Sequence, residues 1–137
     1  MNPIFQAMRT DTRYLEESVK YFREELTQLK EISRRLHFEY VFVLIPDVHQ
    51  VDPRRFEVKA EYYGLDARNL EQKRVSRKIS AALKDFGIPN IDISECVSDA
   101  ESPDRLYFVQ DNHFTAAGHE IAAACMFREE LMKMITK

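Results

Sequence analysis

The sequence predicts an α/β fold in which a short parallel sheet is flanked by helices. Three observations support this prediction. Residues 15–36 and 66–86 each show apolar side chains at helical spacing, and a continuous apolar run lies between them at residues 40–45. A second, shorter apolar run follows at residues 88–93. Strands that alternate with amphipathic helices are typical of parallel sheets covered by helices.

The first helix is predicted from apolar residues spaced three and four apart, with Ser33 in the one gap. Glu16 with Lys20, and Glu31 with Arg35, add pairs four apart in the favourable order. The same spacing resembles a heptad, so a coiled-coil contact is the alternative, but the pattern is short and favours a helix packed on a sheet. The apolar positions are Leu15, Val19, Phe22, Leu26, Leu29 and Leu36.

Residues 40–45 read Tyr-Val-Phe-Val-Leu-Ile and end at Pro46. A continuous run rich in β-branched and aromatic residues indicates a strand that is buried on both faces. The loop after it contains Asp47 and His49. Residues 56–64 are ambiguous, and a short helix ending at Gly64 is one interpretation.

The second helix is expected to begin at Asp66, which is a suitable N-cap. Gly87 suits the position just after its end, and Pro89 prevents its continuation. A strand at residues 88–93 and an extended segment at 106–109 follow. Thr115 is expected to cap the last helix. The apolar side of the second helix is Leu70, Val75, Ile79, Leu83 and Phe86, and that of the last is Ile121, Ala124, Cys125, Leu131 and Ile135.

The chain has 137 residues and 45% hydrophobic residues, which predicts one domain over residues 1–137. Its formal net charge of -3 gives no reason to expect nucleic acid. No stretch is apolar for long enough to span a bilayer, and the start shows no secretion signal. We therefore expect a cytoplasmic protein if the chain is complete. If it is a fragment, a periplasmic or other extracytoplasmic location stays open.

The two cysteines, Cys96 and Cys125, form neither a disulfide framework nor a Cys-x-x-Cys pattern. We expect two reduced, partly buried thiols.

The motif with the clearest chemistry is Asp111-Asn112-His113, which follows the extended segment at residues 106–109. In an extended backbone, side chains two apart point the same way. Asp111 would hold one imidazole nitrogen and fix the tautomer, which leaves the other nitrogen of His113 to take a proton from a serine hydroxyl. The alternative is a capped turn, in which Asp111 closes an Asx-turn and His113 packs at a helix start.

The segment from Asp111 to Gly118-His119 resembles the last sequence block of the SGNH (GDSL-like) hydrolase family. Many members of that family have Asp-x-x-His, whereas Asp-x-His followed by an aromatic residue, here Phe114, resembles the branch related to alginate O-acetyltransferases. The resemblance covers about residues 12–135 in the order of elements. It implies the C-terminal half of a partial three-layer, SGNH/flavodoxin-like fold, with His113 and Asp111 as catalytic base and orienting carboxylate.

The nucleophile of that family is absent from this sequence. Its serine lies in a Gly-Asp-Ser-like block on the first strand, and glycine and asparagine blocks supply the oxyanion donors. No serine here follows a glycine in a turn after an apolar strand. The serines are Ser18, Ser33, Ser76, Ser80, Ser94, Ser98 and Ser102. We therefore expect the chain alone to be inactive, as a truncated or degenerate esterase or acyltransferase, and whether it is an enzyme stays undecided.

Asp47 and His49 follow a predicted strand, where α/β proteins place ligands. They are weak candidates for substrate contact, and a solvated loop is the favoured interpretation. A metal site formed by Asp111, His113 and either His49 or His119 is a further alternative, but the spacing matches no strong ligand pattern. His119 is interpreted as a packing residue in the last helix.

The implied reaction is hydrolysis or transfer of an acyl ester, with an O-acylated carbohydrate or small molecule as substrate. No cofactor and no metal are expected. The alternative is a non-catalytic interaction module that uses the N-terminal amphipathic helix. A narrow sheet with a fully buried first strand would lack neighbours, so we expect the chain to self-associate or to be only marginally stable.

Overall fold

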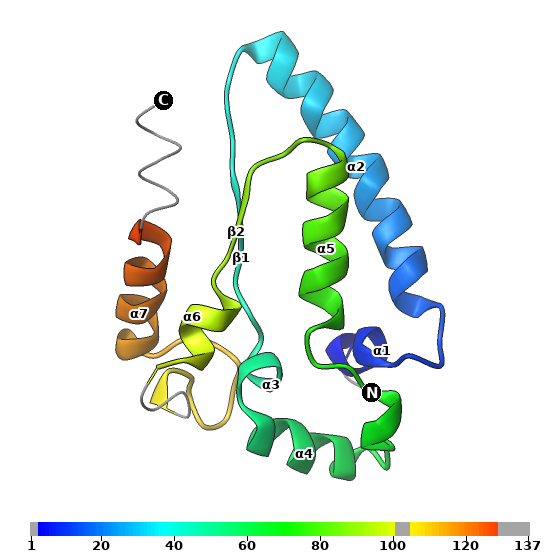
Figure 1. Ribbon diagram of the computed structural model, residues 1–137, viewed down its shortest axis with the longest axis vertical. Coiled ribbons are helices and arrows are strands. Elements are labelled where there is room, and N and C mark those ends of the chain that lie inside the picture. The colour runs from blue at the N-terminus through cyan, green and yellow to red at the C-terminus, as the bar shows by residue number, and fades with distance from the viewer. Residues whose placement is uncertain (1–2, 101–104, 129–137) are drawn as a thin grey trace. The chain divides into compact units, whose positions relative to one another are not determined.

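The computed structural model describes residues 3–100 and 105–128 and shows a mixed helix and strand architecture (Figure 1). The two strands form one short parallel sheet, in which the Phe42 amide donates to the Pro89 carbonyl (3.0 Å) and the Ile93 amide to the Leu44 carbonyl (3.3 Å). The predicted α/β class is therefore confirmed. The elements are α1 (Pro3–Met8), α2 (Tyr14–Leu36), β1 (Phe42–Leu44), α3 (Val48–Val51), α4 (Pro53–Tyr62), η1 (Ala67–Asn69), α5 (Arg74–Asp85), β2 (Asn90–Asp92), α6 (Ser94–Ser98) and α7 (Ala116–Phe127).

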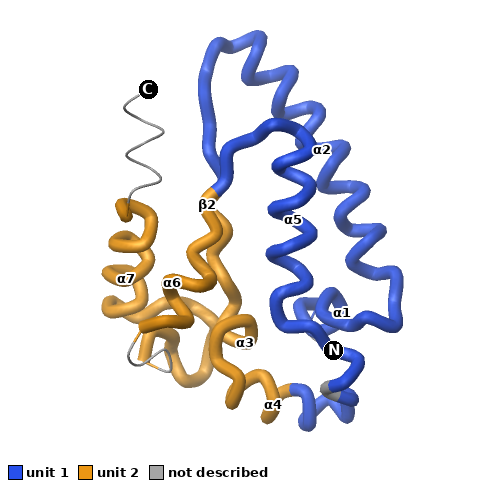
Figure 2. The backbone as a smooth tube through the Cα atoms, in the orientation of Figure 1, with its two compact units in different colours: residues 1–42, 60–90 blue, residues 43–59, 91–137 orange. Residues whose placement is uncertain are grey.

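The chain divides into two compact units (Figure 2). Unit 1 contains residues 1–42 and 60–90, and unit 2 contains residues 43–59 and 91–137. The chain passes from one unit to the other within β1, α4 and β2. The single domain expected over residues 1–137 stays a prediction. None of the described helices is long and apolar enough to cross a membrane.

Unit 1 is built around α2, which packs against α1 and α5. The predicted helix is confirmed, and its inward stripe buries Leu15 and Leu26 completely or nearly so. These side chains share the core of this unit with Phe5 and Met8 of α1 and Leu83 of α5. The apolar residues at helical spacing in α2 therefore pack mainly against other helices.

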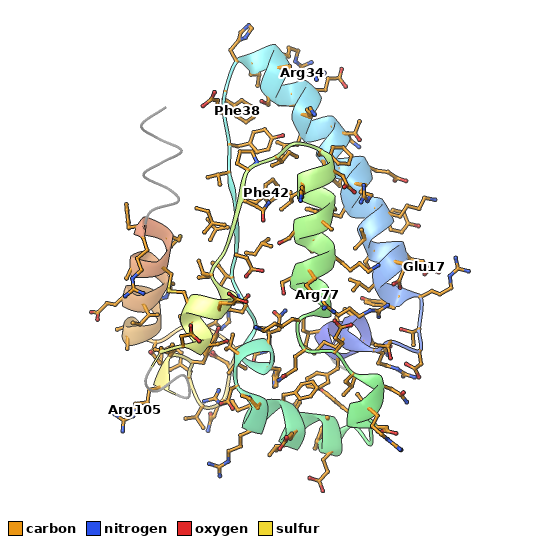
Figure 3. All side chains as sticks on the ribbon, viewed as in Figure 1. Glu17, Arg34, Phe38, Phe42, Arg77 and Arg105 are labelled. Carbon is orange, nitrogen blue, oxygen red and sulfur yellow. A yellow bond between two sulfur atoms is a disulfide. The ribbon has the colours of Figure 1, made fainter. Side chains whose placement is uncertain are left out.

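An aromatic row joins α2 to the segment that leads into β1 (Figure 3). Ring centroids are 5.8 Å apart for Phe38 and Tyr40, 6.1 Å for Tyr40 and Phe42, and 6.1 Å for Phe42 and Phe22 of α2. Residues two apart in an extended segment share a face, so the alternation places these rings together. The prediction that residues 40–45 form a strand buried on both faces is wrong, because the β1 residues are half-buried and Ile45 is 59% exposed. Only β2 pairs with β1 in the described part of the chain.

The second helix begins later than predicted, at Arg74 rather than after Asp66. Backbone bonds to the α1 end hold residues 69–71 outside the helix: Thr10 donates to the Asn69 carbonyl (2.9 Å) and Glu71 to the Met8 carbonyl (3.0 Å). Asp66 caps the η1 turn instead, through the Arg68 amide at 2.9 Å. The end of the helix is as predicted, with Gly87 just beyond it at a φ of 66°.

Unit 2 packs α6 against both α3 and α7. Its buried side chains include Val48, Val51, Ile93 and Val97. Leu131 and Ile135, the last two apolar positions predicted for the final helix, lie outside the described residues.

The expectation of two reduced thiols is wrong. Cys96 of α6 and Cys125 of α7 form a disulfide with their Cα atoms 6.0 Å apart. Spacing alone gave no pairing signal, because the two residues are 29 apart and come together only when α7 packs on α6.

Candidate functional site

The Asp111-Asn112-His113 turn lies in a loop that is closed at its base by backbone hydrogen bonds. The Phe108 amide donates to the His113 carbonyl (3.0 Å), and the Thr115 amide donates to the Leu106 carbonyl (2.9 Å). The extended segment expected at residues 106–109 is reduced to an isolated antiparallel bridge between Tyr107 and Phe114. Leu106 and Tyr107 are buried, so they fix the base of the loop in unit 2. The tip projects outward.

The start of α7 fixes the other side of this loop. Thr115 is the predicted N-cap: its side chain accepts the Gly118 amide at 3.2 Å, and its hydroxyl donates to the Arg105 carbonyl at 2.9 Å. Gly118 allows the first turn of α7 to approach the backbone of Leu106 closely. A Cβ atom at this position would clash with the Leu106 carbonyl oxygen and would lie 2.9 Å from the Phe114 Cβ atom. The glycine and the cap together set where the loop enters the helix.

Asp111 and His113 lie together at the tip of this loop. Oδ1 of Asp111 accepts a hydrogen bond from the His113 backbone amide at 2.8 Å, and it also lies 3.2 Å from Nδ1 of the His113 ring. The Asx-turn and the acid–base contact, which the sequence left as alternatives, therefore coexist. The imidazole is 87% exposed and the carboxylate 54%. With Nδ1 facing a carboxylate, the proton is placed on Nδ1 and Nε2 becomes the basic nitrogen.

A second Asp-x-His motif, Asp47-Val48-His49, has the same local geometry inside unit 2. Oδ1 of Asp47 accepts the His49 amide at 2.9 Å and lies 2.6 Å from the His49 Nδ1 atom. Gln50 completes a capping box, because its Oε1 accepts the Asp47 amide at 2.8 Å. The favoured interpretation of a solvated loop is wrong: these residues begin helix α3, and only 8% of the His49 side chain is exposed. Such burial leaves little histidine surface for a substrate.

The two motifs are connected. Asn112, the middle residue of the exposed motif, donates from Nδ2 to Oδ2 of Asp47 at 2.7 Å. Nearby, the Tyr107 hydroxyl donates to the Pro46 carbonyl at 2.8 Å, and Arg55 of α4 donates to the Phe108 carbonyl at 2.9 Å. These three contacts tie the loop to the segment that follows β1.

The electrostatics at Asp47 follow from these contacts. Burial alone would raise the pKa of this carboxyl, but hydrogen bonds from the His49 side chain and amide and from Asn112 outweigh it and hold the pKa below its ordinary value. The same carboxylate acts on Tyr107. Burial, assisted by the Asp47 charge, raises the pKa of the Tyr107 hydroxyl far above its ordinary value, so Tyr107 remains a hydrogen-bond donor.

The described residues supply no group of metal ligands, and Ser94, a serine that directly follows a strand, is buried. No group of three His, Cys, Asp or Glu side chains converges within residues 3–100 and 105–128. Ser94 follows β2 directly, but it is buried and its hydroxyl has no hydrogen-bond partner within the described residues. Ser102 lies outside them. His119 packs edge-on against Phe114, with ring centroids 5.8 Å apart, in agreement with the packing role expected from the sequence.

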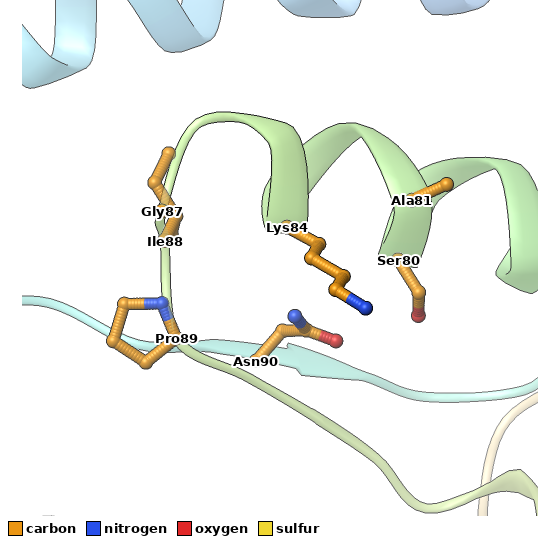
Figure 4. Close-up of a pocket in the computed structure, with 7 residues that line it drawn as sticks. All are labelled: Ser80, Ala81, Lys84, Gly87, Ile88, Pro89 and Asn90. Atoms are coloured by element: carbon orange, nitrogen blue, oxygen red, sulfur yellow. The ribbon is translucent and has the colours of Figure 1, made fainter.

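A separate hollow of about 490 Å³ lies in unit 1, beside the end of α5 and the start of β2 (Figure 4). Ser80, Lys84 and Asn90 contribute its polar atoms, and Ile88 and Pro89 contribute apolar wall. None of the four site residues predicted from the sequence lines it. It therefore adds no support to the acid–base site.

Sequence reasoning missed Asn112, Tyr107 and Arg55 as contributors to the site. The tyrosine carried a signal, because a tyrosine in a buried apolar segment needs a partner for its hydroxyl. Asn112 carried none, since an asparagine between Asp and His is ordinary turn composition. No family model matches the chain, and no curated protein and no solved structure matches it either.

Proposed function

We propose that unit 2 carries the acid–base half of an acyl-transfer site of SGNH type, which acts on an O-acylated carbohydrate by hydrolysis or transfer. One observation carries the proposal: the Asp111 carboxylate lies 3.2 Å from Nδ1 of an imidazole that is 87% exposed. An imidazole oriented by a carboxylate through one nitrogen, with the other nitrogen open to a reactant, is the arrangement that a general base requires.

In the proposed reaction, Nε2 of His113 takes the proton from a hydroxyl group as its oxygen attacks the acyl carbonyl carbon. The imidazolium that forms is stabilised by Asp111, which keeps its negative charge. His113 then returns the proton to the leaving sugar oxygen as the ester bond breaks, which leaves the acyl group on the attacking serine. Water, for hydrolysis, or an acceptor hydroxyl, for transfer, then attacks this acyl-serine while His113 takes its proton and returns it to the serine oxygen. The attacking serine and the oxyanion donors must come from residues other than the Asp111–His113 loop.

The choice of an O-acylated carbohydrate as substrate rests on the resemblance to the alginate O-acetyltransferase branch and on one local feature. Phe108 is 52% exposed and lies in the same loop as His113, to whose carbonyl its amide donates, so the loop carries an open apolar ring. Aromatic rings with an open face commonly line the apolar parts of ligand sites. Val109, the next residue of this loop, is 88% exposed.

We expect the chain alone to show no turnover of p-nitrophenyl acetate above that of free imidazole. The reason is that the sequence lacks the Gly-Asp-Ser-like block and the glycine and asparagine blocks that supply the nucleophile and the oxyanion donors, and these groups account for most of the rate in such enzymes. Turnover that survives Ser→Ala changes at all seven serines but disappears in His113→Ala would contradict this mechanism.

The positive test is a nuclear magnetic resonance titration of the chain with acetylated xylo-oligosaccharide and, in parallel, with the same sugar after deacetylation. The proposal expects resonances of residues 108–113 to shift more with the acetylated sugar. His113→Ala should abolish the difference, whereas His37→Asn in unit 1 should preserve it. Equal shifts with both sugars, or shifts confined to other residues, would argue against an O-acylated carbohydrate.

A second candidate function is a non-catalytic interaction module, favoured by a second apolar stripe on α2. Tyr14, Tyr21, Ile32 and Leu36 are 43%, 67%, 39% and 61% exposed. At about 100° per residue they fall within about 60° of arc on one side of the helix. Sedimentation of the chain over a hundredfold concentration range tests self-association through this stripe. Tyr21→Ser with Leu36→Ser should reduce it, and a monomer at every concentration would contradict it.

A further inference from the structure

We propose that Asp47 is a positioning residue for the Asp111-Asn112-His113 turn and acts through the amide of Asn112. The description of the turn as a part of a catalytic site rests on the proposed function. The mechanical link between Asp47 and the turn stands on the geometry alone.

The two carboxylate oxygens of Asp47 have different partners. Oδ1 receives both hydrogen bonds from His49, at 2.9 Å from the amide and 2.6 Å from the ring. Oδ2 receives the Asn112 side chain at 2.7 Å. The side chain is 19% exposed, so these bonds are only partly shared with water. Because one oxygen is committed to α3 and the other to the loop, the carboxylate joins the two.

The position of Asn112 makes this joint effective. It lies between Asp111 and His113, so a fixed Asn112 side chain fixes the backbone on both sides of the acid–base contact. The other two ties, from Tyr107 to Pro46 and from Arg55 to Phe108, act at the base of the loop. The bond from Asn112 to Asp47 acts at the tip itself. Removing it should leave the base in place and free the tip.

The charge of Asp47 is required as well as its shape. An asparagine at this position would keep one oxygen acceptor for His49 but would present an amide nitrogen toward the donor of Asn112. Hydrogen bonds to a charged acceptor are about twice as strong as neutral ones, so the carboxylate holds both partners better than an amide. Its pKa, held below the ordinary value, keeps it ionised at neutral pH.

The experiment is hydrogen exchange at the His113 and Phe108 amides, which donate to Asp111 Oδ1 and the His113 carbonyl. Asn112→Ala changes an exposed side chain and leaves the core intact, and Asp47→Asn removes the acceptor. Loss of one such bond is expected to speed exchange at the His113 amide about tenfold. Amides of α5 should not change. Asp66→Asn is the matched control, because Asp66 makes the same side-chain bond to an amide two residues on, in unit 1.

Rescue separates positioning from general destabilisation. Asp47→Asn combined with Asn112→Asp reverses donor and acceptor, so it should restore at least half of the lost protection at His113. Unchanged exchange in Asn112→Ala, or equal acceleration throughout unit 2 without rescue, would overturn the proposal. The readout needs no catalysis. If exchange changes as expected but the acetylated sugar does not bind, the positioning link stands and the acyl-transfer function fails.

Discussion

The molecule contains the same three-residue pattern twice, and the two copies have different surroundings. In Asp47-Val48-His49 and in Asp111-Asn112-His113, the carboxylate accepts the histidine amide and contacts its Nδ1 atom. In the first copy the histidine side chain is 8% exposed, and in the second it is 87% exposed. Local geometry is therefore set by the Asp-x-His spacing, while burial decides what the histidine can reach.

The difference in exposure agrees with the proposed division between a supporting motif and a reactive one. A base must meet its reactant, so the exposed imidazole of His113 suits proton transfer. The buried copy is at the start of helix α3, where its carboxylate receives bonds from both its own helix and the loop of the other copy. Breaking a buried charged contact costs more than breaking an exposed one.

The largest expected effect concerns the disulfide, which encloses the exposed motif and not the buried one. Cys96→Ser should lower the free energy of unfolding by about 3 kcal/mol. The reason is that the disulfide closes the loop between residues 96 and 125 and so lowers the conformational entropy of the unfolded chain. Denaturant unfolding checks this, with Cys125→Ser as the matched variant. Identical midpoints for all three proteins, with two thiols titratable in the native wild type, would contradict the pairing.

Removing each carboxylate in turn compares the two motifs directly. Asp47→Ala should cost about 2 kcal/mol of folding stability, because the buried donors of His49 and the exposed amide of Asn112 lose their acceptor. Asp111→Ala should cost less than about 1 kcal/mol, because the pair is exposed to water. Unfolding in urea measures both. Equal losses would mean that burial does not distinguish the motifs.

Gly118→Ala probes the approach of α7 to the loop. Alanine favours a helix by about 1 kcal/mol over glycine, so an unconstrained site would be stabilised. Here the new Cβ atom would meet the Leu106 carbonyl, and we expect a net loss of about 1 kcal/mol because overpacking costs more than the helix gains. Ala123→Gly, elsewhere in α7, gives the ordinary helix cost for comparison. A more stable Gly118→Ala protein would contradict the close approach.

Acidification should affect the buried motif through Asp47. Its folded-state pKa is lowered, so its stabilising contribution is fully present above the ordinary value of the unfolded carboxyl, about 4. The contribution is lost as the pH falls from there through the folded-state pKa. Asp47→Asn should therefore lose less stability than the wild type between pH 6 and pH 3. Parallel pH profiles for the two proteins would contradict the assigned shift.

The parts of the fold that follow from local patterns were predictable from the sequence. The period of α2, the glycine after α5 and the Thr115 cap each depend on a few neighbouring residues, and each is present. The start of α5 was not predictable, because backbone bonds from the end of α1 hold residues 69–71 outside the helix. The disulfide was missed for the same reason: partners distant in sequence decide it.

The candidate site divides in the same way. The contact between Asp111 and His113 follows from spacing and could be anticipated, and it is present at 3.2 Å. The bond from Asn112 to Asp47 joins residues 65 apart and depends on how the loop packs against the segment after β1. The burial of His49 likewise depends on packing in unit 2. Neither the bond from Asn112 to Asp47 nor the burial of His49 could be predicted from neighbouring residues in the sequence.

The most direct test of the contrast is the rate at which diethyl pyrocarbonate modifies each histidine, followed by mass spectrometry of the peptides. We expect His113 to react at least tenfold faster than His49, because the reagent needs access to the imidazole and the two side chains are 87% and 8% exposed. His37 and His119 serve as internal references, since both lie at exposed positions. Unfolding in urea should bring all four rates together. Similar rates for His49 and His113 in the native protein would contradict the assignment of one motif to support and the other to chemistry.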